Sequence, residues 1–110
     1  YDPKRPFFDQ LKELTLKVYE IFNNSRDYGF RDQIQRASIS IMNNIAEGFE
    51  RKSNKEFKQF LYIAKGSCGE VRSMLYVALE LKYIPKTNYD LLCNLSLEIS
   101  KMLSGFIKTL

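Results

Sequence analysis

RASISIMNNIAEGF, residues 36–49, is the stretch that decides the fold of this 110-residue chain. When the stretch and its flanks are wound as a helix, small and apolar residues recur at spacings of three and four and share one face. These residues are Ile34, Ala37, Ile41, Ile45 and Gly48. Ile39, Met42 and Ala46 widen the apolar surface to roughly 200° of the circumference, which is more than one neighbour would cover. The stretch therefore predicts a helix that packs against more than one partner.

The composition is typical of a globular protein, with 45% hydrophobic and 27% charged residues. A chain of 110 residues is long enough for one core and too short for two, so residues 1–110 are predicted to form a single domain. No apolar run approaches the roughly 20 residues that a membrane span requires. We therefore expect a cytoplasmic protein without a membrane partner.

The chain contains no histidine, and its two cysteines, Cys68 and Cys93, stand alone on separate expected helices. The lack of histidine removes the commonest general base and the usual metal ligand. Free cysteine packs like a small hydrophobic residue, so we expect both cysteines to be buried and reduced. We expect no metal, no cofactor and no enzymatic activity.

Helical spacing of apolar residues along the whole chain predicts an all-α fold. The expected helices span about residues 7–24, 31–49, 54–83 and 88–109. Ser53 and Glu56 have the spacing of a capping box at the start of the third helix, and Pro85 prevents that helix from continuing. Thr87 and Asp90 suggest a looser cap for the fourth helix. Because the connections are short, the helices are predicted to form an antiparallel up-down-up-down four-helix bundle.

The third expected helix carries two apolar seams. The seam predicted to face the bundle core contains Phe57, Leu61, Ala64, Cys68, Val71, Leu75 and Ala78. The second seam contains Ile63, Ser67, Glu70, Met74, Val77, Leu81 and Ile84. A small bundle seldom needs both seams, so we hypothesise that the second seam and the flank of residues 31–49 form a homo-oligomeric interface. The alternative is that the second seam faces another helix of the same subunit.

Polar residues beside these seams are predicted to hold helices and subunits in register. The set on the second helix is Arg36, Ser40, Asn44 and Glu47. This set lacks the paired acid and base or the metal-collecting carboxylates that catalysis would need, so we assign it a structural role. Glu70 interrupts the second seam and would need a donor such as Arg36 or Arg72, within the chain or in another subunit, unless Glu70 is exposed.

Two glycines, Gly66 and Gly69, lie inside the third expected helix. Each costs roughly 1 kcal/mol of helix stability relative to alanine. The cost predicts a close helix approach or a bend at these positions, and the alternative is that a long, well-packed helix tolerates both.

A formal charge of +4 permits binding to nucleic acid. The candidate contacts are Arg31, Arg36, Arg51, Lys52, Lys55 and Lys58. Several flank the expected turn between the second and third helices, where a symmetric oligomer would repeat them into a ring, although nearby glutamates dilute their charge. Tyr62, Tyr76 and Tyr83 could stack on bases, but packing or interface roles are favoured because they form no stacking platform.

Three segments resemble a bacterial four-helix-bundle family first noticed in intervening sequences of 23S rRNA genes. They are GFRDQIQRASISIMNNIAEGFERKSNKEF (29–57), FLYIAKGSCGEV (60–71) and ALELKYI (78–84). The resemblance implies an antiparallel bundle that commonly assembles as a homopentamer with a central channel. The family is similar to the accessory variability protein of diversity-generating retroelements, whose pentamer binds nucleic acid and its reverse transcriptase.

The resemblance and the residues together lead to two hypotheses about function. The first is a non-enzymatic homo-oligomer, with a pentamer favoured, that acts as a scaffold or adaptor for RNA, DNA or a nucleic-acid enzyme. The second is direct, sequence-nonspecific binding of nucleic acid through a ring of basic residues, with affinity that falls steeply as salt rises.

Overall fold

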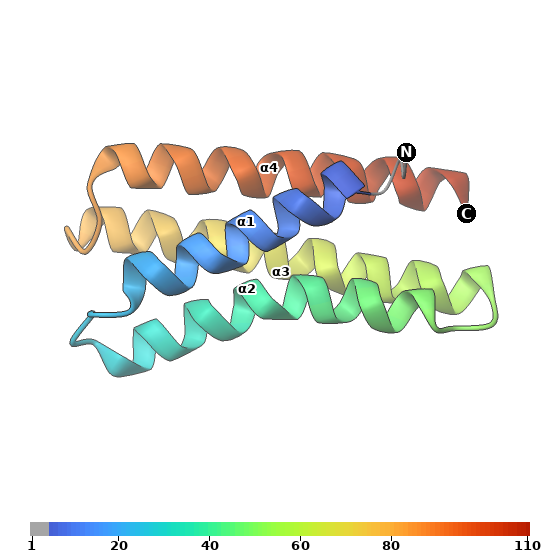
Figure 1. Cartoon of the computed structure of the whole chain (residues 1–110), viewed down its shortest axis with the longest axis horizontal. Helices are drawn as coiled ribbons and strands as arrows, with labels where there is room; N and C mark the ends of the chain where they lie inside the picture. Colours follow the sequence, from blue (N-terminus) through green and yellow to red (C-terminus); the bar gives the residue numbers. More distant parts are fainter. Residues whose placement is uncertain (1–4) are drawn as a thin grey trace.

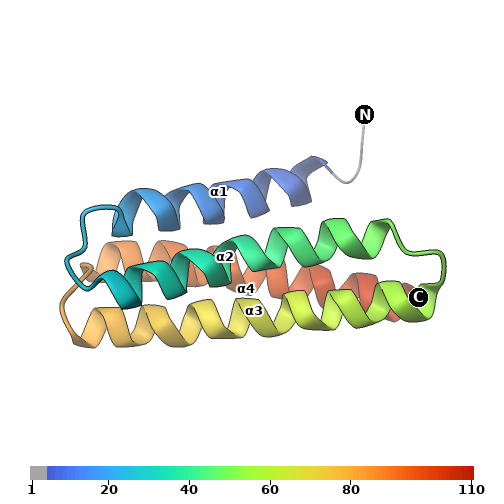
Figure 2. The ribbon, with the colours of Figure 1, turned by 90° about the horizontal axis from the view of Figure 1, so that it is seen from below.

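The computed structural model describes residues 5–110, which form four antiparallel helices. They are α1 (Arg5–Phe22), α2 (Tyr28–Phe49), α3 (Asn54–Glu80) and α4 (Lys86–Thr109). Contacts join α1 to α2, α2 to α3, α3 to α4 and α4 to α1, so the helices follow one another around the bundle (Figures 1 and 2). No strand occurs in residues 5–110, and the predicted all-α up-down-up-down bundle is confirmed.

The core consists of one apolar stripe from each helix. The large side chains that are almost fully buried include Leu11, Leu14, Val18, Phe22, Ile34, Ile41, Ile45, Leu61, Leu75, Leu92, Ile99 and Leu103. The central helix face predicted from residues 36–49 is therefore buried, against both α1 and α3. Ile39 and Ala46, which widened the predicted apolar arc, are exposed, so the buried arc is narrower than the sequence suggested.

Gly48 lies where α2 approaches α3 closely. A Cβ atom at this position would lie 2.8 Å from Cδ1 of Phe57 and 3.1 Å from Cβ of Phe60. The Phe57 ring is itself held by the rings of Phe49 and Phe106, with centroid distances of 4.9 and 6.2 Å. Only a residue without a side chain fits here.

Gly66 and Gly69 do not mark a close approach. A Cβ atom at Gly66 would meet nothing within 4 Å, and one at Gly69 would meet only Nη2 of Arg72, at 3.8 Å. The predicted close helix approach at these two glycines is therefore wrong within the chain. The alternative of tolerated helix glycines describes them.

The helix ends differ from the predicted ends where capping chemistry was overlooked. The α2 helix begins at Tyr28 because Oδ1 of Asp27 accepts a hydrogen bond of 3.1 Å from the backbone N–H of Phe30. At the start of α3, Oγ of Ser53 accepts from the Glu56 N–H at 3.2 Å, as the spacing predicted. The looser cap from Thr87 and Asp90 is wrong, because α4 begins at Lys86 behind Pro85 with no side-chain cap. Pro85 occupies the N-cap position in an extended conformation and has no side-chain acceptor to offer.

The α3 helix ends at Glu80, before the predicted end at residue 83. Lys82 adopts the left-handed conformation, with φ of 62°. The N–H of Tyr83 then donates to the Ala78 carbonyl at 2.8 Å, and the N–H of Lys82 donates to the Leu79 carbonyl at 3.0 Å. This pair of bonds is a Schellman motif, in which glycine is the usual left-handed residue.

Replacing Lys82 with glycine is expected to raise the free energy of unfolding by about 0.5–1 kcal/mol, because glycine adopts positive φ without steric cost. Urea denaturation followed by circular dichroism measures the change. Lys12→Gly is the matched control, because Lys12 is exposed and lies in the middle of α1. This substitution should instead lower stability by about 1 kcal/mol. A loss of stability in both variants would contradict the prediction.

The two cysteines differ in burial. Cys68 is fully buried in the core, whereas Cys93 is only partly buried, so the prediction that both are buried holds for Cys68 alone. Burial raises the pKa of the Cys68 thiol from 9.0 to about 11, against smaller opposing effects of the Arg72 charge and of a hydrogen bond with Ser96. The folded state therefore strongly prefers the neutral thiol.

This preference predicts a loss of stability at alkaline pH. Below pH 9.0 the thiol is neutral in both states, and between pH 9.0 and about 11 it ionises only in the unfolded chain, which favours unfolding. Urea denaturation at neutral pH and at about pH 10.5 should show a larger drop for the wild type than for Cys68→Ala. Equal drops in the two proteins would refute the assignment. Burial also raises the pKa of Cys93, so Cys93→Ala should reduce the drop as well, but less than Cys68→Ala.

Candidate functional site

The outer face shared by α2 and α3 holds a hollow with unpaired charges. The hollow has a volume of about 660 Å³ and is lined by Gly29, Asp32, Gln33, Arg36, Ala37, Ser40 and Glu70. Within residues 5–110 neither Arg36 nor Glu70 forms an ion pair, and both are exposed. Arg72 lies on another side of α3, where its Nη1 donates to Oγ of Ser96 at 3.0 Å. Glu70 is therefore exposed, which is the second of the two predicted alternatives. It faces the same hollow as Arg36.

The second seam of α3 divides between the interior and the surface. Ser67, Met74 and Ile84 are buried within the subunit. Ile63, Val77 and Leu81 remain 52%, 42% and 53% exposed. These three positions extend along about 27 Å of the helix axis, at spacings that place them on the same flank of α3 as Glu70. We call them the exposed apolar row.

A short chain of polar side chains joins α2 to α3 beside the hollow. Nδ2 of Asn44 donates to the carbonyl and to Oγ of Ser40, at 2.8 and 3.0 Å. Oγ of Ser40 lies 3.1 Å from Oγ of Ser67, which completes the connection across the helix pair. Arg36 and Glu47 were predicted to belong to this polar set, but no hydrogen bond links them to it within residues 5–110. Their charges remain available on the surface.

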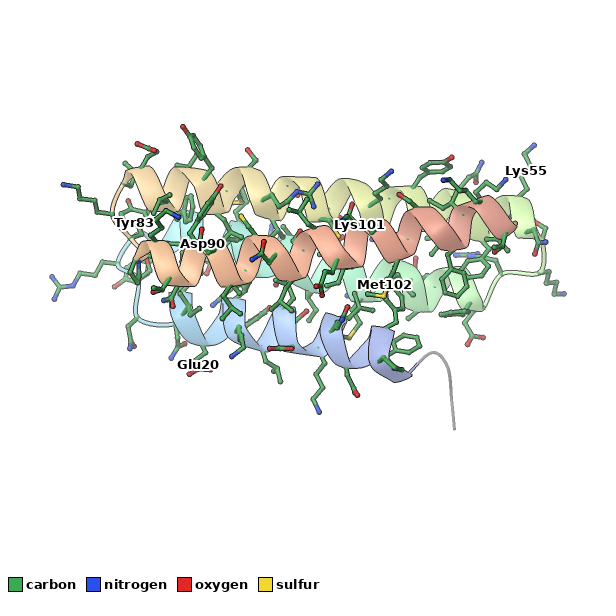
Figure 3. The ribbon with its side chains drawn as sticks, turned by 90° about the horizontal axis from the view of Figure 1, so that it is seen from above. Glu20, Lys55, Tyr83, Asp90, Lys101 and Met102 are labelled. Atoms are coloured by element: carbon green, nitrogen blue, oxygen red, sulfur yellow. The ribbon has the colours of Figure 1, made fainter. Side chains whose placement is uncertain are left out.

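The basic residues predicted to contact nucleic acid do not form one patch. Nε of Arg31 is 3.0 Å from Oδ1 of Asp32, and the Arg31 guanidinium lies over the Tyr28 ring. Arg36 lies in the hollow, and the Arg51 guanidinium stacks over the Phe60 ring with its centre 4.7 Å from the ring centroid. The remaining three are Lys52 and Lys55, exposed near the α2–α3 turn, and Lys58, partly buried in α3. Figure 3 shows Lys55 at this end of the bundle. Glutamates 47, 50 and 56 lie among them in the sequence, so the positive charge stays diluted.

A tether at the opposite end of the bundle was not predicted. The hydroxyl of Tyr83 donates to Oδ2 of Asp27 at 2.8 Å, and the Tyr83 ring meets the Phe30 ring edge-on at 5.5 Å. This hydrogen bond raises the pKa of Tyr83. Asp27 therefore caps α2 and also ties the α1–α2 loop to the α3–α4 turn. The capping position of Asp27, three residues before Phe30, is the signal that could have identified it.

Among residues 5–110, no three His, Cys, Asp or Glu side chains gather closely enough to hold a metal ion. None of the four helices in that range has the length and apolar character needed to cross a membrane.

Comparisons with known proteins agree on fold and family. The family model for the 23S rRNA-intervening sequence protein matches residues 7–105, a range that contains all three segments that carry the resemblance, so the predicted family is confirmed. A crystal structure from Bacteroides thetaiotaomicron VPI-5482, of a protein with unknown function from the S23 ribosomal protein family, has a TM-score of 0.86 and 28% sequence identity. The similarity covers 93% of this chain and 98% of that one. No curated protein matches the sequence.

Proposed function

The chain belongs to the family of 23S rRNA-intervening sequence proteins, and from this premise we propose that it is a non-enzymatic, homo-oligomeric scaffold assembled through the α2–α3 face. The observation that carries the proposal is the exposed apolar row next to two unpaired charges. Ile63, Val77 and Leu81 keep about half of their surface in water although they lie in a regular helix. Contact with another subunit would remove this apolar surface from water, which is favourable.

The charges of Arg36 and Glu70 in the hollow also support assembly through the α2–α3 face. Arg36 and Glu70 have opposite sign, face one hollow and have no ion-pair partner within residues 5–110. In a symmetric assembly, Arg36 of one subunit can pair with Glu70 of the next, which would fix the register of the subunits. The pentamer implied by the resemblance is the favoured assembly.

The role of the assembly is to hold other molecules. We propose that the oligomer docks RNA, DNA or a nucleic-acid enzyme, as the resemblance to the retroelement accessory protein suggests. A ring of charge built from the α2–α3 turn is the weaker proposal for direct nucleic-acid binding. Arg51 is stacked on Phe60, and three glutamates lie among the basic residues in the sequence.

Size-exclusion chromatography with light scattering, at about 10 µM protein, tests the assembly because specific oligomers commonly associate more tightly than this. We expect a mass several times the 12.9 kDa of one chain, and five times that mass for the favoured pentamer. A mass of one chain at this concentration would refute the proposal. A stable dimer would retain the interface and exclude the pentamer.

A further inference from the structure

The neighbouring helices α3 and α4 carry two rows of cations. We call these five residues the α3–α4 basic face: Lys58, Lys65 and Arg72 on α3, and Lys101 and Lys108 on α4. Each row repeats every seven residues, which keeps its members on one side of a helix and about 10.5 Å apart. The bond from Arg72 to Ser96 places the α3 row beside α4. Lys101 and Lys108 line a surface hollow on α4, and Lys101 is labelled near the middle of that helix in Figure 3.

Few carboxylates lie near this face. The only acidic residues in the facing stretches 58–76 and 97–108 are Glu70 and Glu98. Glu70 lies in the hollow on the α2 side, whereas Glu98 lines a hollow with Gln10, Met102 and Lys101 and so lies beside the α4 row. Five cations with one neighbouring carboxylate give this face a positive charge, which can attract a polyanion.

Exposed tyrosines accompany the α3 row. Tyr62 and Tyr76 follow Lys58 and Arg72 by four residues each, and both are 55% exposed. More than half of each ring surface therefore lies in water, where a partner can reach it. The strip between the two rings contains Gly66, whose Cβ position is open, and Gly69, whose Cβ position is approached only by Nη2 of Arg72 at 3.8 Å. Both glycines lower helix stability without serving packing in the chain, so room for a ligand offers a reason to keep them.

We propose that the α3–α4 basic face binds single-stranded nucleic acid, with the phosphates along the cation rows and bases stacked on Tyr62 and Tyr76. Stacking on these rings requires unpaired bases, which favours a single strand over a duplex. The α3 row is about 21 Å long. An acidic protein would satisfy the lysines but would leave the tyrosines and the bare backbone strip without a role.

This surface is separate from the proposed oligomer interface. The exposed apolar row and Glu70 lie on the side of α3 next to α2, whereas Arg72 lies on the side next to α4. Assembly through the α2–α3 face would therefore leave the α3–α4 basic face open. The two proposals can fail independently, because light scattering tests the first and titration with an oligonucleotide tests the second.

The test is fluorescence anisotropy with labelled oligo-dT and oligo-rU of about 12 nucleotides, within the usual size of a single-strand site. Five phosphate contacts at about 0.7 each predict a slope of about −3.5 for log affinity against log salt, or roughly 100-fold weaker binding between about 50 and 200 mM salt. The double variant Lys65→Gln with Lys101→Gln should reduce the slope by about 1.4. The matched control, Lys12→Gln with Lys17→Gln on α1, removes the same charge and should change the slope little.

Variants of the tyrosines separate stacking from charge. Tyr62→Ala and Tyr76→Ala should each weaken binding about tenfold with the salt slope unchanged, and Tyr62→Phe should bind like the wild type. Circular dichroism confirms that each variant is folded. Binding to dT and rU with equal affinity, or with a preference that identifies the sugar, supports the proposal. Equal effects of the α1 control, equally tight binding of a duplex or of heparin, or no binding at about 50 mM salt would overturn it.

Discussion

Replacing Gly48 with valine is expected to lower the free energy of unfolding by about 2–3 kcal/mol, because the new side chain overpacks the core. Its Cβ atom would lie 2.8 Å from the Phe57 ring and 3.1 Å from Cβ of Phe60. The Phe57 ring cannot move aside freely, since Phe49 and Phe106 hold it from two directions. Either α2 and α3 must separate near this end or the aromatic cluster must repack, and both responses lose core contacts.

Urea denaturation measures this effect, and Gly66→Val is the matched control. Gly66 also lies inside a helix, but nothing lies within 4 Å of its Cβ position, so valine should leave stability almost unchanged. Adding Phe57→Leu to the Gly48→Val variant should restore part of the lost stability by removing the clashing ring. Equal changes at Gly48 and Gly66 would show that helix propensity, rather than contact with α3, decides the outcome.

Replacing Ile63 and Val77 together with glutamate is expected to convert the proposed oligomer into monomers. The two side chains are 52% and 42% exposed, so the subunit itself should keep its fold. Each substitution removes about 1–2 kcal/mol of apolar burial from every interface and introduces a charge that must be desolvated. Light scattering should report 12.9 kDa, with the circular dichroism of the wild type. Leu97→Glu on α4, also exposed, should leave the assembled mass unchanged.

A charge exchange tests the register of the same interface. Arg36→Glu should weaken assembly because it places two carboxylates together across the subunit boundary. Adding Glu70→Arg to that variant should restore assembly by re-forming the pair in reverse. Failure of the double exchange to restore the mass would remove the Arg36–Glu70 pair from the proposal.

Local chemistry explains which parts of the fold the sequence predicted well. Heptad-like spacing located all four helices, because burial of one face is the main force that fixes a helix in a small bundle. Ser53 and Glu56 gave the start of α3 correctly, because the cap depends on residues three apart. Asp27 likewise caps the N–H of Phe30, three residues further on. Its second partner, Tyr83, is 56 residues away, and a contact over that distance could not be predicted from local spacing.

The same limit applies to the glycines and to the second seam. Gly48 and Gly66 have equal helix propensity, and only the neighbouring helix decides that the first is essential for packing and the second is not. Regular spacing likewise placed Ser67 and Val77 on one seam. In the structure, Ser67 is buried and lies 3.1 Å from the Ser40 hydroxyl of α2, whereas Val77 remains 42% exposed.

The two ends of the bundle are closed by different forces. At one end, the rings of Phe49, Phe57 and Phe106 meet from three helices, and this apolar contact is insensitive to pH and weakens on cooling. At the other end, the tether from Tyr83 to Asp27 requires a protonated tyrosine, and it lasts until the pH exceeds the raised pKa of Tyr83. Alkali therefore loosens the molecule from the α1–α2 loop, while the ring cluster near the α2–α3 turn is unaffected.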